Sequence, residues 1–304
     1  MLRAFIAAFS SLILLLLVIF ANASLDEELV FYLTFDNIKN QTIIDESGNG
    51  LDAEILERAD IVKGKYGDAI RLTGQSGDCV NIPAQGELKV IGKITMMAWI
   101  YSPETRNNEK MHWLEKDCHF VVPIGWAHCY GIGGVDIRNG PEIFMLLGSH
   151  VDGEWEQQGL QTPHKMDEKK WHHVVGSYDG ETMKIYIDGK VIAAEKKKFE
   201  FFGDNEADVR IGCAKDVPHL TFTNGSIDEA AVWQRALSND EIKQAMTGNF
   251  LAVSPRDKVA TTWADVKRRT VTLSEFLESE IALPLLTLQN PVSDNEAKYL
   301  SIVI

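Results

Sequence analysis

The stretch from Trp171 to Gly189 constrains the fold of this chain more than any other, because it predicts two β-strands joined by a tight turn. In its second half, every other residue from Met183 to Ile187 is apolar, and the residues between them are Lys184 and Tyr186. This period of two predicts one strand face on a core and the other in water. Two Asp-Gly pairs supply the positive φ angles that hairpin turns need. The sequence therefore predicts an antiparallel β-hairpin.

The length and charge of the chain limit what the hairpin can belong to. A chain of 304 residues, 45% of them hydrophobic, can hold one large all-β domain or two ordinary domains. The formal net charge of −14 repels phosphate backbones, so we expect no nucleic-acid partner. An acidic surface also suits hard cations such as calcium, although general solubility explains the total equally well.

The N-terminal residues 1–23 have the layout of a secretory signal peptide. Arg3 precedes an apolar run over residues 4–20, and Ala21-Asn22-Ala23 forms an A-x-A cleavage pattern. We therefore expect a secreted, cell-surface or periplasmic protein. The alternative is that the segment stays uncleaved as a membrane anchor, which would be the chain's one contact with a membrane.

The chain has four cysteines, and export favours disulfides over metal thiolates. They allow three pairings. Cys118 and Cys129 flank a short loop, so we expect a local bridge between them. Cys79 and Cys213, each beside a predicted strand, would form the second bridge. None of the spacings is a CxxC pair, which argues against redox or zinc chemistry.

Short alternating or apolar runs separated by Gly, Asp and Asn fill residues 29–233 and predict an all-β fold, a two-sheet antiparallel β-sandwich or jelly roll. The expected strands are 30–35, 69–72, 79–82, 95–101, 142–147, 173–178, 183–187, 209–212 and 226–233. One short helix is expected after the last strand, because Ser238 to Glu241 is a capping box and Gly248 a stop. Residues 251–304 form a C-terminal extension of unknown role.

A series of segments in this region resembles the laminin-G-like (LamG-like) jelly-roll domain of the concanavalin A-like lectin/glucanase group. The segments include FYLTFD, GKYGDAIRLTG, GDCVNIP, WHHVVGSYDGETMKIYIDGKVIA and GSIDEAAVWQRALSNDEIK, in that order. The resemblance covers residues 29–247 and implies a concanavalin A-like jelly roll. Cys79, where the family usually has an aromatic residue, and the longer insertion around Cys118 and Cys129 depart from it.

The resemblance also implies a calcium site, because many members of the family bind calcium between the first and last strands. Carried over by position, the ligands would be Asp36, Ser47 and Asn49 of the 47–49 loop, and Asp228. The alternative is that Asp45 and Asn49 cap turns and Asp228 hydrogen-bonds a loop. Ca²⁺ is the one cofactor that we expect.

Aromatic and histidine side chains give weaker signals. Three residues of the middle insertions could stack on a sugar ring: Trp126, His128 and Trp155. Three tryptophans within the family motifs are expected in the core instead: Trp99, Trp171 and Trp233. His172 and His173 are adjacent on a strand, so they point to opposite faces and cannot share a metal ion.

The chain has no recognisable catalytic motif. A glycosidase on this architecture needs facing carboxylates, typically Glu-x-Asp-x-Glu on one strand, and no expected strand has them. A Gly-x-Ser-x-Gly elbow and a phosphate loop are also missing. We therefore expect an exported, non-catalytic binding or adhesion module that recognises carbohydrate or an extracellular protein. The alternatives are a polysaccharide-active enzyme (glycosidase or lyase) and a structural surface module.

Overall fold

The computed structural model describes most of residues 24–251 and divides the chain into two compact units, Met1–Arg256 and Asp257–Ile304. All described residues lie in the first unit. They are 24–57, 59–75, 77–85, 88–103, 110–117, 128–137, 140–151, 154–198, 200, 202–203, 207–213, 223–248 and 250–251. The expected signal peptide and all of the C-terminal extension except Leu251 fall outside them.

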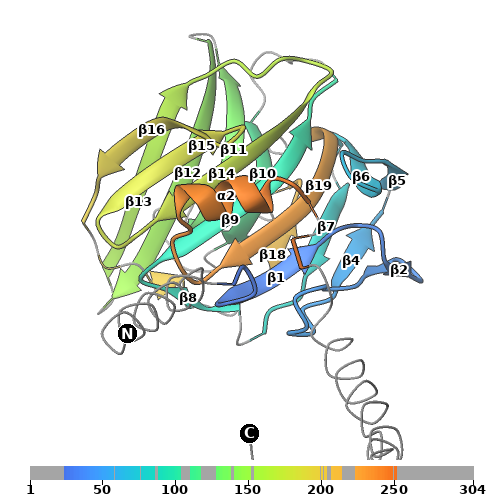
Figure 1. Ribbon diagram of the computed structural model, residues 1–304, viewed down its shortest axis with the longest axis horizontal. Coiled ribbons are helices and arrows are strands. Elements are labelled where there is room, and N and C mark those ends of the chain that lie inside the picture. Colours follow the sequence, from blue (N-terminus) through green and yellow to red (C-terminus); the bar gives the residue numbers. More distant parts are fainter. Residues whose placement is uncertain are drawn as a thin grey trace, which may run out of the picture. The chain divides into compact units, whose positions relative to one another are not determined.

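Eight strands form one antiparallel sheet, here called the front sheet, in which β1 lies beside β19 and the other strands follow the order β16-β15-β14-β9-β19-β6-β5. Figure 1 shows this sheet from its outer side. Its strands are β1 (Leu29–Leu33), β5 (Asp60–Lys63), β6 (Asp68–Thr73), β9 (Ile94–Tyr101), β14 (Trp171–Tyr178), β15 (Thr182–Ile187), β16 (Lys190–Lys196) and β19 (Asn224–Trp233).

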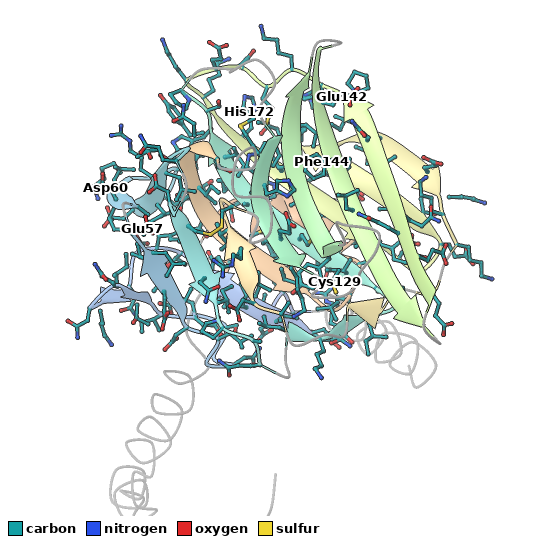
Figure 2. The ribbon with its side chains drawn as sticks, turned by 180° about the vertical axis from the view of Figure 1, so that it is seen from behind. Glu57, Asp60, Cys129, Glu142, Phe144 and His172 are labelled. Atoms are coloured by element: carbon teal, nitrogen blue, oxygen red, sulfur yellow. A yellow bond between two sulfur atoms is a disulfide. The ribbon has the colours of Figure 1, made fainter. Side chains whose placement is uncertain are left out.

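Nine strands form the back sheet, which is also antiparallel and has the order β13-β12-β11-β10-β18-β7-β4-β3-β2. Figure 2 shows it from the opposite side. Its strands are β2 (Ile38–Lys39), β3 (Thr42–Ile43), β4 (Ala53–Leu56), β7 (Cys79–Ile82), β10 (Lys110–Asp117), β11 (His128–Ile137), β12 (Gly140–Val151), β13 (Glu154–Pro163) and β18 (Val209–Ile211). A separate two-stranded ladder joins β8 (Val90–Ile91) to β17 (Phe202–Gly203).

The main core lies between the two sheets. Residues from both sheets enter it, such as Met96 and Val174 from the front sheet and Val80 and Met145 from the back sheet. Gly176 brings the sheets close together, because a Cβ atom there would lie 3.1 Å from the sulfur of Met145. The two packed antiparallel sheets confirm the predicted β-sandwich.

A second apolar cluster covers part of the outer face of the front sheet, beneath helix α2 (Asn239–Ala245). Figure 1 shows α2 lying across the strands of this sheet. Ser238 caps α2 in the predicted capping box, and its side chain accepts a hydrogen bond from the Glu241 amide. No helix in the described part of the chain has the length and hydropathy needed to cross a membrane.

The predicted hairpin is confirmed, but one of its faces differs from expectation. β14 pairs with β15, and Gly180 in the turn has a φ of 97°. Tyr186, expected in water, is only 1% exposed. Its hydroxyl donates a hydrogen bond to Asn239 Oδ1 at 3.2 Å, because α2 packs on this face of the hairpin.

Candidate functional site: an aromatic pocket on the outer face of the front sheet

Four side chains lie in one row across the outer face of the front sheet, beyond the area under α2. Strand register places Arg71 opposite Ser226, Ser226 opposite Tyr101, and Tyr101 opposite Trp171. Directly opposite residues of antiparallel neighbours share a face. That face is the outer one, because the residues next to Arg71, Tyr101 and Ser226 in their strands enter the core between the sheets: Ile70, Ile100 and Ile227.

These four residues line a pocket of about 430 Å³, here called the outer pocket. The described residues that line it are Val62, Lys63, Arg71, Leu72, Tyr101, Pro103, Trp171, Asn224, Gly225 and Ser226. The rings of Tyr101 and Trp171 are 5.5 Å apart between centroids, at 49° to each other, and both are half-buried. The pocket therefore combines an apolar aromatic wall with hydroxyl, amide and cationic groups, which is the usual composition of a ligand site.

A glycine sets the shape of the pocket at β19. Gly225 has a φ of 153°, and a Cβ atom there would collide with the backbone oxygen of Tyr101. Only glycine therefore allows β19 to approach β9 at this point. The absence of a side chain also leaves Asn224 and Ser226 as the groups that β19 contributes to the outer pocket.

Two cations line the outer pocket, and they differ in their partners. Lys63 Nζ lies 2.6 Å from Asp68 Oδ1, and this hydrogen bond raises the pKa of Lys63. Arg71 is exposed and pairs with no acidic side chain of the residues that the structure describes. Its cross-strand neighbour on β5 is Asp60, at the edge of the sheet (Figure 2).

Two of the residues predicted to bind calcium, Asp36 and Asp228, hold the turn that precedes β6. Asp228 Oδ2 accepts the amide hydrogen of Tyr66 at 3.0 Å, and Asp36 Oδ1 accepts that of Asp68 at 2.6 Å. Asp228 is fully buried, and burial raises its pKa to about 8. The side chains of Asp36, near the beginning of the domain, and Asp228, near its end, thus both accept hydrogen bonds from the same turn.

The other two predicted ligands, Ser47 and Asn49, lie at the opposite end of β1. Ser47 Oγ donates to Asp45 Oδ2 at 2.7 Å, and Asn49 Nδ2 donates to the carbonyl oxygens of Leu29 and Val30, both at 2.8 Å. These are the turn-capping contacts of the alternative interpretation. The four predicted ligands therefore form two separate groups, at opposite ends of β1. Among the described residues, no three His, Cys, Asp or Glu side chains gather as a metal-binding group. Calcium binding stays a prediction.

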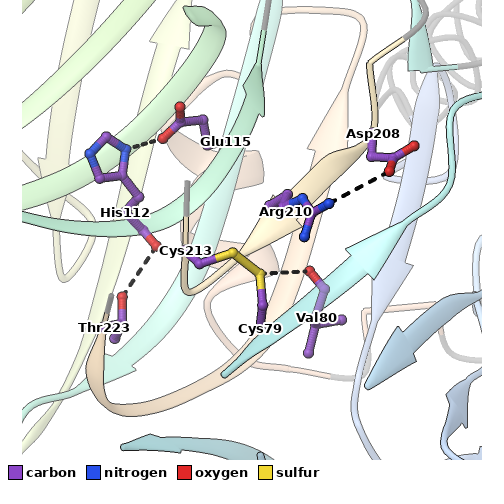
Figure 3. The surroundings of a disulfide bond; sticks show 8 residues. All are labelled: Cys79, Val80, His112, Glu115, Asp208, Arg210, Cys213 and Thr223. Carbon is purple, nitrogen blue, oxygen red and sulfur yellow. Dashed lines mark hydrogen bonds and ion pairs between the residues drawn. A yellow bond between two sulfur atoms is a disulfide. The ribbon is translucent and has the colours of Figure 1, made fainter. Parts of the chain in front are cut away.

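A disulfide joins Cys79 to Cys213, the longer of the two expected pairs, with a Cα–Cα distance of 5.6 Å (Figure 3). It ties the start of β7 to the residues after β18, its neighbour in the back sheet. Cys129 is also disulfide-bonded. Its expected partner, Cys118, lies outside the described residues.

Two of the described histidines, His173 and His112, are buried. His173 packs on Trp99, with ring centroids 5.3 Å apart, and its Nε2 lies 3.3 Å from the sulfur of Met97. Burial lowers the pKa of His173 to about 4, so the ring is neutral at physiological pH. On the back sheet, the side chain of His112 contacts that of Glu115, and both are buried (Figure 3).

The three tryptophans that were expected in the core do not all lie there. Trp99 and Trp233 are buried as predicted, at 5% and 0% exposure. The core assignment was wrong for Trp171, which is half-buried and lines the outer pocket. Its position as the first residue of β14, next to the end of β9, is the signal that could have indicated this. Trp126 lies outside the described residues, and Trp155 and His128 lie on β13 and β11.

Two solved structures with a similar fold are binding domains. The binding domain of Paraclostridial Mosquitocidal Protein 1 is 16% identical, with a TM-score of 0.54 over 73% of this chain and 52% of that one. The ligand binding domain of botulinum neurotoxin serotype D, solved with N-acetylneuraminic acid, is 17% identical, with a TM-score of 0.54 over 74% and 52%. The chain thus spans about half the length of these structures.

Sequence comparison identifies the family. Curated protein sequences gave no match. A family model, Laminin_G_3, matches residues 74–243, more than half of the chain, and includes the aromatic pair of the outer pocket and the disulfide. The chain belongs to the concanavalin A-like lectin/glucanases superfamily.

Proposed function

We propose that this protein is a non-catalytic module that binds carbohydrate in the outer pocket. The observation that carries the proposal is the half-buried pair Tyr101 and Trp171, which forms one wall of a concave site. Aromatic rings bury the apolar C–H face of a sugar, and nearby polar groups can bond its hydroxyls. Here those groups are Arg71, Asn224 and Ser226.

The fold is compatible with this role. Two of the solved structures that it resembles are named binding domains, and one was solved with N-acetylneuraminic acid. Because a fold by itself does not determine a ligand, the proposal depends on the pocket and not on the likeness.

The proposal includes export from the cytoplasm. The disulfide between Cys79 and Cys213 supports an oxidising compartment, since such bonds rarely persist in the cytosol. Residues 1–23 would then act as the signal that directs the chain there. The carbohydrate partner would be an extracellular or cell-surface glycan.

A glycan array tests the proposal. We expect the wild-type protein to bind a defined set of glycans, and Trp171→Ala and Tyr101→Ala each to weaken that binding about tenfold or more. Val191→Ala is the matched control, because Val191 is 46% exposed on β16 of the same sheet but does not line the outer pocket. Thermal melting of each variant checks that it is folded.

Two results would contradict the proposal. If both aromatic variants bound every glycan as tightly as Val191→Ala, the outer pocket would not be the sugar site. If the wild-type protein released reducing sugars from a polysaccharide panel, the enzyme alternative would replace the binding module.

A further inference from the structure

The cationic end of the outer pocket lies opposite its aromatic end. Arg71 on β6 and Tyr101 on β9 flank Ser226 of β19, and Trp171 of β14 follows Tyr101. Neighbouring strands lie roughly 4.8 Å apart, so the backbones at Arg71 and Tyr101 are separated by roughly 10 Å. A sugar ring stacked on the aromatic pair would therefore bring one of its substituents within reach of the Arg71 side chain.

The positive charge of Arg71 is available to bind a ligand, whereas that of Lys63 is already paired with an acidic side chain. Lys63 Nζ bonds Asp68 Oδ1 at 2.6 Å. Arg71 is exposed, and neither Asp60 beside it nor any other described acidic residue forms an ion pair with it. In a chain with a net charge of −14, a guanidinium that lines a pocket and pairs with none of the described acidic side chains is a specific feature.

Among the residues that the structure describes, the lining of the outer pocket carries no acidic side chain. An anion entering it therefore meets two cations and the polar groups of Asn224 and Ser226. The planar guanidinium presents paired N–H donors that match the two oxygens of a carboxylate. A sugar hydroxyl offers no such match.

We infer that the outer pocket selects sugars that carry a carboxylate, and that Arg71 binds this group while the ring stacks on Trp171 and Tyr101. This inference rests on the proposed function and names the substrate class of the same site. Uronic acids and sialic acids share the required chemistry, an apolar ring face with a carboxylate at its edge. Ser226, between Arg71 and Tyr101, is placed to bond a hydroxyl next to that carboxylate.

The test compares acidic glycans with their neutral counterparts. The probes are array glycans ending in glucuronic acid or N-acetylneuraminic acid, and the same glycans after reduction of the carboxylate to an alcohol. We expect the wild-type protein to bind the acidic form about 10- to 100-fold more tightly, which is the range for hydrogen bonds to charged groups. Comparing glycans that end in glucuronic acid with those that end in N-acetylneuraminic acid shows whether the pocket binds uronic acids or sialic acids.

Substitutions then assign the effect to Arg71. Arg71→Gln is expected to remove the preference for the acidic form, and Arg71→Lys to retain part of it, because lysine keeps the charge but not the paired donors. Lys63→Gln is the matched control, since it removes a cation of the same pocket that Asp68 already neutralises. It should change the acidic-to-neutral ratio by less than about threefold. Raising the salt concentration should weaken wild-type binding more than that of Arg71→Gln.

The outcomes separate this inference from the proposed function. Equal binding of acidic and reduced glycans, still weakened by Trp171→Ala, would overturn the inference and leave the proposed function standing. A preference for acidic glycans that survives in Arg71→Gln would also overturn it. Glycan binding that is insensitive to Trp171→Ala and Tyr101→Ala would overturn both.

Discussion

Asp228 accepts the amide hydrogen of Tyr66 at 3.0 Å, across a separation of 162 residues. The bond joins the last strand of the front sheet to the turn before β6, at the point where the family resemblance implied a calcium ion. Gly64 allows the approach, because a Cβ atom there would lie 2.5 Å from Asp228 Oδ2. The side chain of Asp228 therefore has a structural role that does not depend on any metal.

Replacing Asp228 by alanine should lower the free energy of unfolding by about 2 to 4 kcal/mol, because it leaves the partly buried amide of Tyr66 and the buried amide of Glu229 without their acceptor. Urea denaturation measures the change. Asp36→Ala is the matched control, since Asp36 holds the other end of the same turn but is exposed. We expect it to cost about 1 kcal/mol or less. Equal losses in the two variants would show that burial of Asp228 is not the cause.

Calcium binding predicts that EDTA lowers the melting temperature of the protein and that added CaCl₂ restores it. Asp36→Ala should abolish this sensitivity, and it is preferred to Asp228→Ala because its structural cost is smaller. Asn49→Ala tests the second group of predicted ligands in the same way. A wild-type melting curve that EDTA leaves unchanged would show that the calcium prediction is wrong.

Loss of the disulfide between Cys79 and Cys213 should destabilise the domain by about 3 to 5 kcal/mol, because the bond closes a loop with a sequence separation of 134. The measurement is urea denaturation of a Cys79→Ala, Cys213→Ala double variant under non-reducing conditions, which leaves the bond of Cys129 in place. Reduced wild-type protein should be at least as unstable as this variant. A double variant as stable as the oxidised wild type would contradict the prediction.

His173 should make the domain less stable in mild acid. Burial lowers its pKa to about 4 in the folded state, with Asp188 opposing the shift, whereas an unfolded histidine has a pKa near 6.5. Below about pH 6.5 the unfolded chain therefore binds a proton that the folded chain excludes, and the free energy of unfolding falls until the pH reaches about 4.

The His173→Gln variant tests this prediction, because glutamine does not titrate. The wild type should lose about 2 to 4 kcal/mol more than the variant between pH 7 and pH 4, as measured by urea denaturation at each pH. If the two stability curves ran parallel across this range, the buried histidine would not be the source of the acid sensitivity.

Local patterns were sufficient to predict the strands in which apolar and polar residues alternate and the helix with a complete cap. β7 spans Cys79–Ile82, as expected, and Ser238 caps α2.

The alternation of apolar and polar residues failed to predict three strands of the back sheet: β10, β11 and β13. β11 contains three glycines, and β13 is rich in glutamine and glutamate, so neither shows the alternation of a half-buried strand. They form because each pairs with β12 or with another strand of the back sheet.

The candidate site depended on information that local patterns do not contain. The row from Arg71 to Trp171 is made by four strands that are far apart in the sequence, and its register is set by the pairing of β6, β19, β9 and β14. A slip of one residue in any pair would turn a side chain to the opposite face. The sequence therefore indicated Trp171 as a core residue within a family motif and not as part of a pocket.

The sequence alone determined the class of fold, the hairpin, the capped helix and the family resemblance, because each depends on residues within a few positions of one another. Only the tertiary structure decided that Tyr186 is covered by α2, that Asp36 and Asp228 hold one turn, and that Arg71 and Trp171 share a pocket. The physical reason is that burial, partner choice and shared faces depend on which distant segments pack together, and that packing is a property of the complete folded chain.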